Sequence, residues 1–126
     1  MKSDMNSNLS SRQIGDIGED FTCEFLQRKG CVILARNFSI RGGEIDIVAK
    51  KGSVIHFVEV KTRKPDPLTD GQFAITKSKI SRLVRTAQAY IERHEITLSC
   101  VFDVAIVEVS GKEVTDFKYF QRAFTA

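Results

Sequence analysis

The chain has 126 residues and a formal net charge of +3, with 42% hydrophobic and 28% charged residues. This length suits one domain with one core, and the composition is that of a soluble globular protein. No apolar run approaches the roughly 20 residues of a membrane span, and the N-terminal MKSDMNSNLSS lacks the apolar core of a signal peptide. We therefore expect a cytoplasmic protein with a single domain over residues 1–126, of which residues 1–10 are flexible.

The cysteines are far apart in the sequence. Cys23, Cys31 and Cys100 are odd in number and lie in apolar surroundings. This pattern predicts buried free thiols, because a disulfide framework or a zinc site needs paired or closely spaced ligands. The small net charge means that any binding of nucleic acid must depend on where the positive charges lie.

The first predicted element is a helix. Ser10 or Ser11 is its expected N-cap, it runs to about Lys29, and Gly30 is the expected C-terminal stop. Its predicted buried stripe has helical spacing and consists of Ile14, Ile17, Phe21 and Phe25.

Two glycines lie within this helix, where each costs up to ~1 kcal/mol relative to alanine. Gly15 and Gly18 indicate either close packing of the helix on a sheet or space for a phosphate or metal near Glu19. Glu19 itself lies off the apolar stripe. From spacing alone it is either a solvated helix acid or a residue of a site.

Strands are predicted next. Cys31–Phe38 is a short apolar run after the helix stop. Ile45–Lys50 and Val54–Lys61, within GEIDIVAKKGSVIHFVEVK, are rich in Val and Ile and predict a hairpin. Lys51-Gly52 is the predicted two-residue turn, because glycine readily adopts a positive φ.

This hairpin places acids in a buried setting, where a charge is costly unless it is paired or bound to metal. If Lys50 pairs with Ser53, then Asp46 lies opposite Phe57. Side chains alternate along a strand, so Asp46 falls on the same face as Glu59. A register shift of one residue would separate the two acids.

Two carboxylates followed by a nearby lysine are suited to divalent-metal chemistry. Asp46 and Glu59 would supply hard oxygen ligands to Mg²⁺ or Mn²⁺, and Lys61 would steady a water nucleophile or developing negative charge. The structural alternative is a hydrogen-bonded acid at a strand end and a cross-strand ion pair. Glu44 points to the same face, either as a supporting acid or as a partner of Arg41.

A loop is predicted over residues 62–71, which include Pro65 and Pro67. Thr76 is the expected N-cap of a second helix over Lys77–Arg93. Its predicted buried face consists of Ile80, Leu83, Val84, Ala87, Tyr90 and Ile91.

Positive charge is concentrated between Lys61 and Arg93, as a phosphate-backbone contact surface requires. The alternative is an ordinary solvated helix face. Lys79 or Arg82 is the residue expected to reach toward the acids. The candidate nucleic-acid contacts are Arg41, Arg63, Lys64, Lys77, Lys79 and Arg82.

The C-terminal part predicts a strand over Cys100–Val109, a turn at Gly111–Val114 and a short edge strand over Thr115–Phe120. Asp103 either forms an ion pair within the sheet or approaches the site. His56 lies on the face opposite Glu59, so we expect a packed or edge histidine and not a ligand. The order α-β-β-β-α-β-β predicts an α/β fold with one mixed sheet flanked by helices.

Several of these residues carry a family resemblance. Asp46, followed thirteen positions later by Glu59-Val60-Lys61, resembles the signature of the PD-(D/E)xK nuclease superfamily. Gly18-Glu19-Asp20, Arg36-Asn37, Gly43-Glu44-Ile45-Asp46 and Phe57-Val58-Glu59-Val60-Lys61, in this order, resemble the YraN-type family of uncharacterised bacterial proteins, which is similar to archaeal Holliday-junction resolvases.

The resemblance implies a restriction-endonuclease-like fold and a metal-dependent endonuclease acting on DNA, with branched or junction DNA as one candidate substrate. It implies that Asp46, Glu59, the Val60 carbonyl and, more distantly, Glu19 hold Mg²⁺, and that Lys61 assists catalysis. A homodimer would suit cleavage of two strands. A non-catalytic nucleic-acid-binding module and a protein-interaction domain stay open as alternatives. Ile45 stands where the superfamily has proline.

Overall fold

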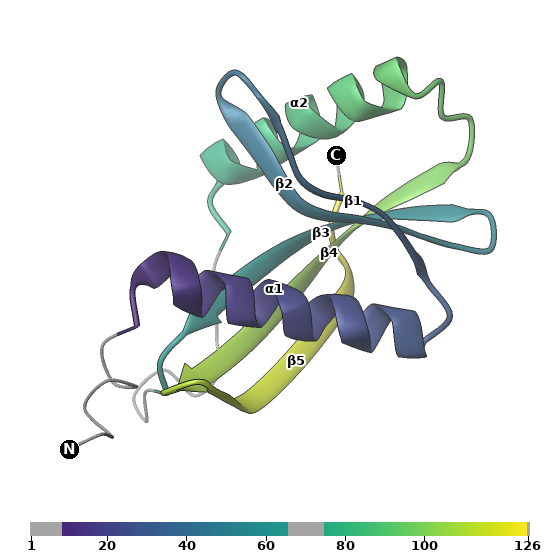
Figure 1. Ribbon diagram of the computed structural model, residues 1–126. Helices are drawn as coiled ribbons and strands as arrows, with labels where there is room; N and C mark the ends of the chain where they lie inside the picture. The colour runs from purple at the N-terminus through teal and green to yellow at the C-terminus, as the bar shows by residue number, and fades with distance from the viewer. Residues whose placement is uncertain (1–8, 66–74, 126) are drawn as a thin grey trace.

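The structure, a computed structural model, describes residues 9–65 and 75–125 (Figure 1). The described residues form a five-stranded mixed sheet and two helices, in the predicted order α-β-β-β-α-β-β. The predicted fold class is therefore confirmed. Of the N-terminal residues expected to be flexible, residues 1–8 lie outside the described part of the chain.

Helix α1 (Ser11–Arg28) begins at a capping box. Ser10 Oγ accepts a hydrogen bond from the Gln13 backbone, while the Gln13 side chain accepts one from the Ser10 backbone. After the helix, Gly30 has φ 92°, a left-handed conformation that glycine adopts without strain. The predicted cap and stop of this helix are confirmed.

The predicted buried stripe of α1 was wrong by about one position. Its four residues are only half-buried, and the phenyl rings of Phe21 and Phe25 pack beside the sheet against Phe117. The residues that face the sheet directly are smaller, because a helix that lies close to a sheet leaves little room beneath it. They are Gly18, Thr22, Cys23 and Leu26.

The strands are β1 (Val32–Ile40), β2 (Gly43–Lys51), β3 (Val54–Arg63), β4 (Ser99–Ser110) and β5 (Glu113–Phe124). They lie in this order across the sheet. Neighbouring strands are antiparallel except β3 and β4, which are parallel. A parallel pair needs a long crossover connection, and helix α2 (Lys77–Arg93) lies within it.

Two strand boundaries differ from the predictions. β3 continues to Arg63, two residues into the predicted loop, because its parallel ladder with β4 extends to the Arg63–Glu108 pair. The rest of that loop, from residue 66, lies outside the described residues. The predicted short edge strand at the C-terminus has 12 residues, since β5 pairs with β4 along most of its length.

The hairpin register also differs from the predicted one. Lys51 pairs with Val54, so the turn residues are Gly52, with φ 60°, and Ser53. The shift amounts to two residues relative to the expected pairing, which preserves the alternation of faces. The ladder ends at the Ile47–Val58 pair, and beyond it the Asp46 carboxylate accepts a hydrogen bond from the Val60 backbone, so Asp46 is not paired with Phe57 as expected.

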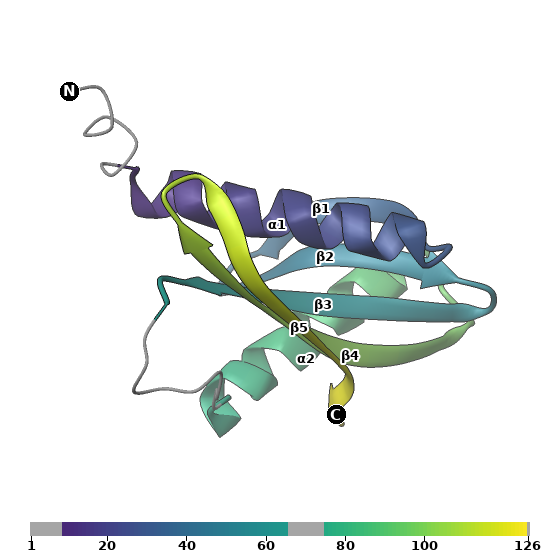
Figure 2. The same cartoon turned by 90° about the horizontal axis from the view of Figure 1, so that it is seen from below.

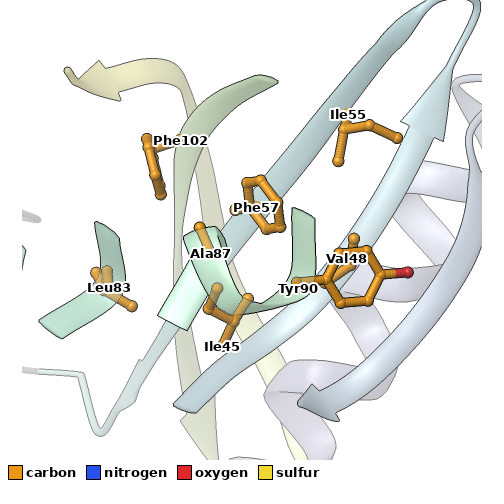
Figure 3. Packing of buried hydrophobic residues seen from close by; sticks show 8 residues of the cluster. All are labelled: Ile45, Val48, Ile55, Phe57, Leu83, Ala87, Tyr90 and Phe102. Atoms are coloured by element: carbon orange, nitrogen blue, oxygen red, sulfur yellow. The ribbon is translucent and has the colours of Figure 1, made fainter. Parts of the chain in front are cut away.

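The helices cover opposite faces of the sheet, as Figure 2 shows. On the α2 side, Phe57, Tyr90 and Leu83 belong to a buried apolar cluster (Figure 3). On the α1 side, Ile47, Val58 and Ala105 form the centre of a second cluster. Each helix also lies very close to one strand at a glycine, α1 at Gly18 and α2 at Gly43 of β2.

A Cβ on Gly18 would overlap the Thr62 side chain, and one on Gly43 would overlap the Thr86 side chain. By contrast, a Cβ on Gly15 would meet nothing within 4 Å. Close helix–sheet packing thus accounts for Gly18 but not for Gly15.

The three cysteines are free thiols, as predicted, with Cys23 and Cys31 buried and Cys100 half-buried. The pKa of each thiol is raised by burial, which disfavours the reactive thiolate.

Neither described helix combines the length and apolar character needed to cross a membrane.

Candidate functional site

A cleft of about 210 Å³ opens between the start of β2, the end part of β3 and the first half of α2. Acidic side chains enter it from the strands and basic side chains enter it from the helix. Its lining consists of Gly43, Glu44, Asp46, Glu59, Val60, Lys79, Arg82 and Leu83. The structure therefore brings together Asp46, Glu59, Val60, Lys79 and Arg82 of the predicted site residues.

Asp46 lies where the pairing of β2 with β3 ends. Its Oδ2 accepts a hydrogen bond of 2.8 Å from the backbone N–H of Val60, so the carboxylate substitutes for a backbone acceptor. Burial raises the pKa of Asp46 to about 7, and the negative charge of Glu59 adds to this effect. Glu19 and Glu44 also raise this pKa, although the hydrogen bond from Val60 lowers it.

Asp46 is thus a carboxylate whose surroundings oppose its ionisation. In such a setting either a proton or a cation relieves the repulsion between neighbouring acids. Strongly perturbed carboxylates in clefts are enriched at functional sites, and this one is perturbed both by burial and by a specific acidic neighbour.

Glu59 meets a cation from the opposite wall of the cleft. Lys79 Nζ lies 3.1 Å from Glu59 Oε2, and the Glu59 side chain is 16% exposed. Lys79 is held at the first turn of α2 by the N-cap Thr76, whose hydroxyl accepts from the Lys79 backbone at 3.1 Å. The cap therefore sets the height at which Lys79 enters the cleft.

Glu19 is positioned differently from the hairpin acids. It projects from α1, and its Oε1 lies 3.4 Å from Arg36, which also pairs with Asp20 at 2.9 Å. Burial raises the pKa of Glu19, while its bonds to Arg36 and Asn37 lower it. The negative charge of Glu19 helps to raise the pKa of Asp46, but the cation that pairs with Glu19 is Arg36.

Lys61 is exposed on β3 and is not among the described residues that line the cleft. Lys77 and Arg41 are also exposed, at the start of α2 and in the turn between β1 and β2. In the described part of the chain, the cations that do line the cleft are Lys79 and Arg82.

A second cleft, of about 410 Å³, lies at the start of α1. Arg63 and Lys64 line it together with Gly15, for which an added Cβ would meet only open space. Val60 lines both clefts, so the end of β3 separates them. Of the predicted basic residues, Lys79 and Arg82 therefore line the first cleft and Arg63 and Lys64 line the second, whereas Arg41 and Lys77 line neither.

The oxygen donors of the acidic cleft fit a small hard cation. Mg²⁺ keeps several waters and is commonly held by one or two carboxylates together with substrate phosphate. Asp46 and Glu59 are two such carboxylates, and their mutual repulsion is what a divalent ion relieves. Within residues 9–65 and 75–125, no three Asp, Glu, His or Cys side chains gather closely enough to hold a metal. The fit is therefore to a two-carboxylate site.

Sequence reasoning missed a buried polar cluster on the α1 side of the sheet. Asp103 is fully buried and accepts hydrogen bonds from Tyr119 at 2.5 Å and from the Arg122 backbone at 3.0 Å. His56 Nδ1 lies 2.6 Å from the same carboxylate. The signal was an acid in the middle of the apolar run CVFDVAIVEV. His56 is packed and half-buried, and Asp103 has its polar partners within the sheet and does not approach the site.

Known proteins match this chain over most of its length. Residues 18–109 match the model of Uncharacterised protein family UPF0102. A UPF0102 protein of Dictyoglomus turgidum is 36% identical over 118 residues, which cover 92% of this chain and 100% of the relative. A UPF0102 protein of Nostoc sp. is 42% identical over 111 residues, covering 82% of this chain and 79% of the relative.

Proposed function

The chain belongs to the UPF0102 family, the YraN-type family that its motifs resemble. On the basis of the acidic cleft, which Asp46 and Glu59 line, we propose that it is a divalent-metal-dependent endonuclease acting on DNA. The observation that supports this most is the pair of hairpin carboxylates, Asp46 and Glu59, in one cleft with the cations of α2. The raised pKa of Asp46 supports it as well, because it marks a site that favours an added positive charge.

In this proposal the residues of the cleft have separate roles. Asp46 and Glu59 hold the cation, with the Val60 carbonyl beside them and Glu19 contributing negative charge from α1. A bound Mg²⁺ supplies Lewis-acid stabilisation of the charge that develops on the scissile phosphate. The Val60 N–H fixes the Asp46 carboxylate, so this ligand is oriented before the metal binds.

The positive charges account for how DNA would approach an acidic site. Carboxylates repel the phosphate backbone, so neighbouring cations must hold it near. Arg82 lines the acidic cleft, while Arg63 and Lys64 line the cleft on the other side of Val60. Arg41 and Lys77 are also exposed, and each precedes a residue of the acidic cleft, Gly43 or Lys79, by two positions in the sequence. The DNA backbone would place its scissile phosphate at the cleft of Asp46 and Glu59, and flanking phosphates would contact Arg63 and Lys64.

The test is metal binding and cleavage in the wild type and in Glu59→Gln, with Glu113→Gln as the matched control on β5. We expect Mn²⁺ binding by calorimetry and nicking of a labelled four-way junction or duplex, both lost in Glu59→Gln and kept in Glu113→Gln. Comparing the junction with the duplex identifies the substrate.

Two other results would refute the proposal. An intact substrate at saturating protein, with a salt-dependent shift in a gel, would indicate a nucleic-acid-binding module without catalysis. A protein that neither binds nor cleaves DNA would be an interaction domain whose acids form an ion cluster.

Lys61→Met tests the catalytic role that the family resemblance implies for Lys61, a residue that follows Glu59 by two positions on β3 but does not line the cleft. Lys61 is exposed, so its loss should change the free energy of unfolding by less than about 0.5 kcal/mol. We expect DNA affinity to be kept and turnover to be lost, as measured by gel shift and single-turnover cleavage. Turnover at the wild-type rate would remove Lys61 from the mechanism.

A further inference from the structure

The acidic cleft already contains one cation, the ammonium group of Lys79. It lies 3.1 Å from Glu59 Oε2, and its side chain is 42% exposed while that of Glu59 is 16% exposed. Within the described part of the chain, Lys79 is the cation at ion-pair distance from Glu59, and it comes from a different wall of the cleft. The ion pair therefore bridges β3 and α2 across the cleft.

A divalent ion and the Lys79 ammonium group are both attracted by the negative charge of Glu59. A metal bound through Glu59 would bring a like charge close to Nζ, and two cations at that separation repel strongly in a partly buried site. The Lys79 side chain is long, flexible and half-exposed, so it is able to move into solvent without breaking the core.

We propose that Lys79 is a resident counter-cation that a divalent metal must displace from Glu59, so that this lysine sets the metal affinity of the cleft. The inference rests on the proposed function, since it takes the hairpin acids as the metal site. Once displaced, the ammonium remains attached to the first turn of α2, beside Arg82, where the substrate phosphate would enter.

The experiment measures Mn²⁺ affinity by calorimetry at one fixed pH for the wild type, Lys79→Met, Lys79→Arg and Lys77→Met. Lys77→Met is the matched control, because it removes the same charge from an exposed position two residues earlier on the same helix. Circular dichroism checks that each variant is folded. NMR of the lysine ammonium groups during a parallel titration with diamagnetic Mg²⁺ follows Lys79 directly.

We expect Lys79→Met to raise the Mn²⁺ affinity by about three- to tenfold, as expected for removal of a partly buried competing ion pair. Lys77→Met should change it by less than about twofold, which is the general effect of one distant charge. Lys79→Arg should stay close to the wild type. In the wild type, the Lys79 ammonium signal should shift as metal is added.

The outcomes separate this inference from the proposed function. If the wild type binds Mn²⁺ and Glu59→Gln does not, but Lys79→Met behaves like Lys77→Met, only the inference is wrong. If Lys79→Met lowers the affinity, the inference is also wrong, because the lysine then supports the metal. If the wild type does not bind, binding gained by Lys79→Met supports the inference, and its absence overturns both.

Discussion

Asp46 provides the sharpest test of the electrostatics of the cleft, through the substitution Asp46→Asn. Asparagine keeps the side-chain oxygen that accepts from Val60, and it removes the charge that burial and Glu59 disfavour. In the wild type, the folded state holds the Asp46 proton up to a pKa of about 7, whereas the unfolded chain loses it near 3.8. The folded state therefore binds more protons between these values, and the stability falls as the pH rises through this window.

The magnitude follows from the two pKa values. At about 1.4 kcal/mol for each pH unit, ionising Asp46 costs the folded protein at most about 4 kcal/mol in all, of which about 3 kcal/mol falls between pH 5 and pH 7. Relaxation of the cleft and solvent screening reduce this, so we expect a measured effect of about 1 to 3 kcal/mol.

Urea unfolding at pH 5 and pH 8, in EDTA, measures it. The free energy of unfolding of Asp46→Asn, relative to that of the wild type, should be about 1 to 3 kcal/mol higher at pH 8 than at pH 5. Asp116→Asn, the same change at an exposed carboxylate on β5, is measured at both pH values as the matched control. Mg²⁺ at pH 8 should stabilise the wild type but not Asp46→Asn.

The same difference between Asp46→Asn and the wild type at pH 5 and pH 8 would refute the reasoning. It would mean that the carboxylate is ionised without penalty, and that the acidic neighbours do not act on it.

Three further substitutions test the close packing at the glycines and the buried polar cluster of Asp103. Gly43→Ala should destabilise the protein by about 1 to 3 kcal/mol in urea unfolding, because the new methyl overlaps the Thr86 side chain; Gly15→Ala, with open space around the new methyl, should be neutral or slightly stabilising. Tyr119→Phe should cost about 2 kcal/mol, since it removes a hydrogen bond to the buried Asp103 carboxylate; a thermal shift within error of the wild type would mean that solvent replaces this bond.

Elements with strong local signals were predicted well. The second helix has the predicted bounds and N-cap, Thr76 before Lys77–Arg93, because a capping side chain and an amphipathic period act within a few residues. The hairpin turn was placed one residue too early, since Gly52 with its positive φ suits either position of a two-residue turn.

Packing details were predicted less well. The apolar stripe on α1 favoured the large side chains, whereas contact with the sheet selected small ones such as Gly18 and Thr22. A helix pattern reports which side is apolar, but the distance between helix and sheet depends on both partners. The length of β5 was underestimated for a similar reason, because its pairing partner β4 determines how far it extends.

The sequence by itself predicted that Asp46 and Glu59 come together, and both line one cleft. Alternation alone does not fix the Asp46 side chain, because Ile45 packs on the α2 side of the sheet and Ile47 on the α1 side. Only the tertiary structure decided which charges meet these acids. Lys79 approaches Glu59 and Arg36 approaches Glu19 because α2 and α1 pack at particular heights on opposite faces of the sheet. Such contacts join residues 20 and 17 positions apart in the chain, and no local pattern specifies them.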